Sequence, residues 1–258
     1  EPIPDDVTTH SFGAVTPWAT GFRLHWAVRK GAPGTYLAGV LERYGGQETA
    51  LSRNLAEPEV IQAMLAAGRA EDLAAALSRV LESPGEGPLS RRRLSWNAYS
   101  WAVPLFDAGR DDLREAGGRA LEIWRNMHES PAPREDLDRV RRMCEARGAL
   151  VDGDLAAAAA ALEGETPPPF FFSFGDGLAL QAMLSSLGEL GSPGRGELEV
   201  SVEKFLAGAP RELARGFLRG ELPDMEGGVW PVPTFIPEWR LWPALWLERR
   251  GESERALG

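Results

Sequence analysis

The stretch Ala108-Gly109-Arg110-Asp111-Asp112-Leu113 separates two apolar segments of the chain and is typical of a joint between helices. Glycine favours the left-handed backbone that ends a helix, an acidic residue favours the positive N-terminus of the next helix, and leucine begins its buried face. The same order of glycine, acid and leucine recurs at residues 68–73, 153–155 and 196–198. The four glycines lie about 40 residues apart, which indicates a repeated pair of helices.

Apolar residues at helical spacing fill the segments between these joints and predict an all-α protein. Residues 130–133 are expected to break the helical pattern, as are the proline- and glycine-rich residues 220–237. Residues 170–174 and 228–235 are weak strand candidates. The predicted helices cover residues 17–30, 36–44, 57–67, 71–82, 94–108, 112–127, 136–151, 155–162, 178–190, 199–207 and 211–219, and a last helix holds Trp239, Trp242 and Trp246.

One amphipathic helix pair cannot bury its own apolar face, so stacked helical hairpins are expected, with an irregular helical bundle as the alternative. Residues 57–208 resemble tetratricopeptide-type αα-repeats, most clearly at Gly153-Asp154-Leu155 with Ala158 and Leu162, although the units exceed the 34 residues of that family. The resemblance implies a helical scaffold rather than an activity. We expect a single domain over residues 1–258, with an N-terminal arm at 1–16 and a sub-boundary at 164–169.

The composition indicates an acidic, folded protein. The chain has 38 Asp and Glu against 28 Lys and Arg, a net charge of −10, and a hydrophobic fraction of 43%. This charge is unsuited to nucleic acid and would suit a basic protein partner. Without a run of about 18 apolar residues, no membrane span is expected. Basic residues that are almost all arginine, with abundant alanine, indicate a bacterial protein, which we expect to be cytoplasmic; whether a leader preceded Glu1 stays open.

Patterns that would carry catalysis or bind metal are few. The three histidines do not share a helical face, and the single cysteine, Cys144, is expected to be buried, so no metal site, disulfide or cofactor is predicted. Adjacent carboxylates at helix starts, such as Asp111 and Asp112, are interpreted as groups that stabilise the helix N-terminus. We therefore assign no catalytic residue and expect binding rather than catalysis.

Two aromatic segments interrupt the pattern of helices and supply the candidate binding residues. The first covers residues 170–177, and the second covers residues 230–246. In the first segment Asp176 is interpreted as a helix N-cap, and the alternative is a ligand pocket with Asp176 at its mouth. In the second segment the tryptophans of the last helix are expected to form a core stripe, and the alternative is an aromatic binding surface. The candidates are Phe170, Phe172, Phe174, Asp176, Trp230, Trp239, Trp242 and Trp246.

These observations favour a non-catalytic protein that binds a protein partner through a concave face or the tryptophan-rich C-terminal end. The chain is similar in size and charge to helical immunity proteins of bacterial toxin systems, which implies an acidic surface that covers a basic toxin. The alternative is a helical enzyme or small-molecule-binding protein that uses the pocket near Asp176. The oligomeric state is left open.

Overall fold

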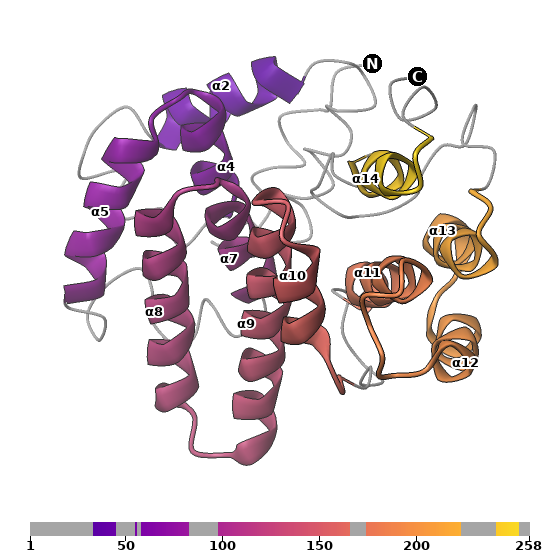
Figure 1. The fold of residues 1–258 in the computed structure, drawn as a ribbon. Helices are drawn as coiled ribbons and strands as arrows, with labels where there is room; N and C mark the ends of the chain where they lie inside the picture. The colour runs from indigo at the N-terminus through magenta and orange to yellow at the C-terminus, as the bar shows by residue number, and fades with distance from the viewer. Residues whose placement is uncertain are drawn as a thin grey trace. The chain divides into compact units, whose positions relative to one another are not determined.

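The computed structural model describes residues 33–44, 55, 58–82, 98–165, 174–222 and 241–252. This part of the chain contains eleven helices and no strand, so the prediction of an all-α protein is confirmed (Figure 1). The described residues belong to two compact units, the first ending at Pro104 and the second beginning at Leu105. None of the described helices is long and apolar enough to cross a membrane. The predicted arm at 1–16 and the helix at 17–30 lie outside the described residues.

The first unit contains α2 (Pro33–Tyr44), α4 (Pro58–Ala66), α5 (Ala70–Glu82) and the beginning of α7 (Ala98–Asp107). Helix α2 packs against α4, and α4 contacts α5. The buried face of α5 follows the helical period, because Leu73, Leu77 and Leu81 lie four residues apart. Trp101 of α7 is fully buried, and its indole Nε1 donates a hydrogen bond to the carbonyl oxygen of Leu55 at 2.6 Å.

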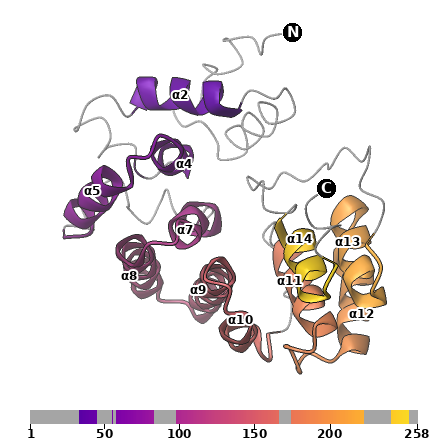
Figure 2. The same cartoon turned by 45° about the horizontal axis from the view of Figure 1, so that its top comes forward.

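The second unit begins with three neighbouring helices, α8 (Asp111–Met127), α9 (Pro131–Val151) and α10 (Leu155–Leu162). Helix α9 contacts α8 on one side and α10 on the other (Figure 2). Ala158 and Ala159 of α10 are buried in the core of this unit. Their small side chains let α10 lie close to its neighbours, as its run of alanines predicts.

Four more helices complete the second unit: α11 (Phe174–Ser186), α12 (Arg195–Phe205), α13 (Gly208–Arg219) and α14 (Leu241–Arg249). Helix α11 contacts α10, α12, α13 and α14, so it is the central helix of this group. One continuous apolar core joins these helices to the end of α9 and to α10. Its fully buried members include Met183, Phe217 and Trp246.

The first three predicted joints are confirmed. Gly68, Gly109 and Gly153 each lie between two helices and have positive φ angles of 70°, 65° and 75°. After α9 the amide of Gly153 donates to the carbonyl of Leu150 at 3.0 Å, and the amide of Asp154 donates to Ala149 at 2.9 Å. These are the two bonds of a Schellman motif, in which glycine adopts the left-handed conformation at low energy.

The fourth predicted joint is wrong. Gly196 is the second residue of α12, and the positive-φ glycine that follows α11 is Gly188, whose φ is 78°. The Glu197 side chain accepts a hydrogen bond from the amide of Gly194 at 3.1 Å, so the Gly-Glu-Leu pattern lies in the first turn of a helix. An acidic residue is favourable both after a joint and in a first helical turn, and the pattern alone does not separate the two cases.

Five helices begin three to five residues earlier than predicted: α2, α9, α11, α12 and α13. The reason is visible in two of them. Helix α9 begins at Pro131 because proline is well suited to the first turn, where its missing N–H needs no partner, so the expected break covers only the residues just before it. Helix α11 begins at Phe174, which makes Asp176 its third residue and not its N-cap. A Cβ on Gly177 would lie 3.1 Å from the sulfur of Met143 in α9, so the missing side chain permits this close packing.

Candidate interaction surface at the helix joints

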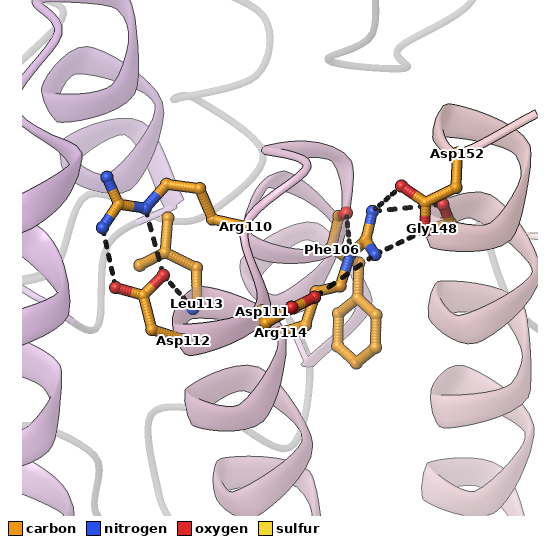
Figure 3. Close-up of polar contacts among 8 residues, drawn as sticks. All are labelled: Phe106, Arg110, Asp111, Asp112, Leu113, Arg114, Gly148 and Asp152. Carbon is orange, nitrogen blue, oxygen red and sulfur yellow. Dashed lines mark hydrogen bonds and ion pairs between the residues drawn. The ribbon is translucent and has the colours of Figure 1, made fainter.

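The joint between α7 and α8 and the joint between α9 and α10 lie side by side in the second unit. A Cβ on Gly109 of the first joint would lie 3.6 Å from the side chain of Val151, which directly precedes the second joint. Figure 3 shows that the residues of both joints come together at one end of α8 and α9. Two segments of similar sequence therefore form one continuous polar end.

The side chain of Arg114 in α8 connects the two joints. Its Nη1 and Nη2 atoms donate to the two carboxylate oxygens of Asp152 at 2.6 and 2.8 Å (Figure 3). The same guanidinium donates to the carbonyl oxygens of Phe106 and Gly148 at 3.1 and 3.2 Å. The last carbonyl groups of a helix have no intrahelical partner and carry its negative dipole end, so the end of α9 attracts a guanidinium.

Ion pairing shifts the titration of the carboxylates at these joints. The hydrogen bonds from Arg114 lower the pKa of Asp152, and the ion pair raises the pKa of Arg114. In the same way, the side-chain hydrogen bond from Arg110 lowers the pKa of Asp112. The side chain of Asp111 is fully exposed and lies 3.9 Å from Nη1 of Arg114. Asp111 is therefore the most accessible carboxylate of the three.

A second arginine reaches the α9–α10 joint from the other end of the sequence. Nη2 of Arg249, in the last turn of α14, donates to the carbonyl oxygen of Gly153 at 3.1 Å. The next residue, Asp154, is the N-cap of α10 and accepts a hydrogen bond from the amide of Ala157 at 2.9 Å. One joint thus accepts guanidinium groups from two other helices, α8 and α14.

An exposed apolar side chain lies among these charges. Val151 is 44% exposed, and Val200 is the other large hydrophobic residue found exposed in the described part of the chain. We use the name joint surface for the exposed residues Asp111, Asp112, Val151, Asp152, Gly153 and Asp154. This surface combines an apolar contact with carboxylates, the composition that an arginine side chain with its aliphatic stem would complement.

The sequence-predicted binding residues are only partly described. Phe170, Phe172, Trp230 and Trp239 lie outside the described residues. Phe174 and Asp176 form part of the first turn of α11, but their side chains are outside the described part. The ligand pocket with Asp176 at its mouth therefore stays a prediction.

The two described tryptophans of the last helix are buried in the core of the second unit. Trp246 is 1% exposed, and its Nε1 donates to the hydroxyl of Ser186 at 2.7 Å. Its ring lies 5.7 Å from that of Phe217, with the guanidinium of Arg250 at 4.4 Å. Trp242 is 3% exposed. Both tryptophans are therefore buried in the core, as the prediction of a core stripe requires.

The sequence alone does not identify the arginines that connect the residues of the joint surface. Nothing in the sequence distinguishes Arg114 and Arg249 from the many other arginines of the chain. Their contacts with Asp152 and Gly153 span 38 and 96 residues of sequence. The joints are the one related signal in the sequence, and their pattern predicts a scaffold rather than a binding site. Among the described residues, no group of three histidine, cysteine or acidic side chains is placed to hold a metal ion.

No family model, curated protein or solved structure matches this chain. Its joint surface is therefore the basis on which a function can be proposed.

Proposed function

We propose that the protein is a non-catalytic binding protein that captures a basic protein partner at the joint surface, through an arginine side chain of that partner. The observation that carries the proposal is the convergence of Arg114 and Arg249 on one joint, at Asp152 and at the carbonyl of Gly153. A site that accepts guanidinium groups from two helices of its own chain has the acceptors and the negative charge to accept one more from outside. Asp111 is the carboxylate best exposed to receive it.

The overall charge supports the same partner. With a net charge of −10, the chain attracts a basic protein over a distance of several ångströms and raises the rate of encounter. Alongside this we propose the tetratricopeptide-type arrangement of helical hairpins over residues 57–208, with joints at Gly68, Gly109 and Gly153. The more specific form of the proposal is an immunity-type protein of the bacterial cytoplasm that neutralises a basic toxin.

The proposal is tested with synthetic peptides of defined charge. A helical alanine–arginine peptide is titrated into the full-length protein by isothermal calorimetry, with a lysine and a glutamine version as comparison. Binding that is tightest for the arginine peptide and weakens with salt is expected, because planar guanidinium pairs better with carboxylates. Amide chemical shifts should change at residues 109–114 and 151–155.

A pair of charge-matched variants locates the site. Asp111→Asn removes the most exposed joint carboxylate, and we expect about two- to fivefold weaker binding of the arginine peptide. Glu122→Gln makes the same change of charge three turns further along α8 and should leave the affinity unchanged. Equal effects of the two variants, or shift changes confined to other residues, would overturn the joint surface as the binding site.

A further inference from the structure

We propose that Arg249 of α14 is an internal competitor for the joint surface, so that binding of the partner requires the release of this contact. The inference rests on the proposed function, because it concerns the regulation of the same site. Arg249 is exposed, and its guanidinium donates to the carbonyl oxygen of Gly153. It occupies one of the acceptors that a partner's arginine would use.

The geometry separates the contact of Arg249 from the attachment of its helix. Helix α14 is held to the core one turn earlier by Trp246, through its bond to Ser186 and its ring contact with Phe217. Trp242, a further turn earlier, is buried as well. Arg249 can therefore leave Gly153 by a rotation of its side chain, while α14 stays in place.

Competition follows from charge at the shared acceptor. A carbonyl oxygen has two lone pairs, but a second guanidinium beside Arg249 would meet a like charge at close range. The end of α9 already pairs with Arg114 through Asp152, so the incoming group would use the exposed Asp111 carboxylate and, once Arg249 is released, the Gly153 carbonyl. A partner then binds only the fraction of molecules in which Arg249 is released. The apparent Kd is therefore the intrinsic Kd divided by that fraction.

The experiment uses the full-length protein and the alanine–arginine peptide. Arg249→Gln removes the competing charge, and we expect about two- to fivefold tighter binding of the peptide than in the wild type. Arg195→Gln is the matched control: it makes the same change of net charge at an exposed residue of α12, which pairs with Glu199 at 3.3 Å. It should change the affinity by less than about 1.5-fold.

Each outcome has a defined consequence. Tighter binding by Arg249→Gln alone, with a larger change of the Asp154 amide shift on titration, supports the inference. If the wild type binds the peptide and Arg249→Gln binds it equally or more weakly, the competition is wrong while the proposed function stands. Equal tightening by both variants means that net charge is the cause and also overturns the inference. If neither the wild type nor Arg249→Gln binds the peptide, both the inference and the proposed function are wrong.

Discussion

Asp107 at the end of α7 and Arg147 in α9 form a buried ion pair, and its removal should be strongly destabilising. Nε and Nη2 of Arg147 donate to the two carboxylate oxygens of Asp107 at 3.1 and 2.6 Å, and the side chains are 3% and 14% exposed. Breaking a buried pair leaves an uncompensated charge and costs about 3–5 kcal/mol. For Asp107→Ala we expect about 3 kcal/mol, because Trp242 still lies 5.7 Å from the guanidinium and offers a cation–π contact.

Replacing both partners should reverse most of this loss. The double variant Asp107→Leu with Arg147→Met removes both buried charges. It therefore loses the attraction between the two charges, but it also avoids the free-energy cost of removing them from water. Such replacements are often neutral or stabilising, so the double variant should lie within about 1 kcal/mol of the wild type. The single variant should therefore be less stable than the double one, which is the reverse of additive behaviour.

Native-state hydrogen exchange of the most protected α9 amides is the appropriate assay, since it reports unfolding of the second unit without assuming that both units unfold together. A loss of 3 kcal/mol corresponds to exchange about a hundredfold faster. Asp136→Ala provides the control, because Asp136 forms a pair with Arg139 in the same helix that is much more accessible to solvent, with side chains 41% and 30% exposed, and its loss should cost less than about 1 kcal/mol. A loss below about 1 kcal/mol for Asp107→Ala, or a double variant as unstable as the single one, would refute the reasoning.

Three further predictions concern the joints and the cysteine. Gly153→Ala should reduce the free energy of unfolding by about 1 kcal/mol because φ is positive, whereas Gly196→Ala, inside α12 with open space around it, should raise it by about 0.5 kcal/mol; urea denaturation compares them. The Asp152 carboxyl should titrate below its ordinary pKa of about 3.9 in a ¹³C NMR titration, and Arg114→Gln should raise the midpoint. Because the folded pKa is lowered, the stability contributed by this pair is present above pH 4 and is lost as the pH falls through the folded pKa. Burial raises the pKa of the Cys144 thiol, so a thiol reagent should react with the unfolded chain and not with the native protein.

Local patterns were sufficient to predict most of the described helices. Helix α10 matches its predicted range of 155–162, and α5 differs from its prediction by one residue. The apolar period and the terminating glycine lie within each of these segments, so no distant contact was needed. The predictions at Pro131 and Gly196 are wrong because the residues of these segments do not by themselves decide the structure. Each residue type is compatible with a loop and with a first helical turn, and packing decides between them.

The candidate site could not be predicted in the same way, because its contacts are distant in sequence. Nothing near Arg249 indicates that its side chain reaches Gly153, since the approach depends on how α14 packs through Trp246. The ion pair of Arg114 with Asp152 likewise depends on the register of α8 against α9. A joint can be located from its own residues, but its neighbours follow only from the packing of whole helices.

The same chemistry that stabilises the helix ends also explains how the helix joints acquire an acidic surface. Every joint places the free carbonyl groups of one helix next to the carboxylates that stabilise the start of the following helix. A single joint is largely satisfied by its own bonds, such as the capping bond of Asp154. Where two joints lie side by side, Arg114 pairs with Asp152 and lies 3.9 Å from the exposed Asp111, and the Gly153 carbonyl accepts a hydrogen bond from Arg249. An acidic surface at these joints therefore follows from the scaffold itself, because the residues that stabilise the helix ends also form it.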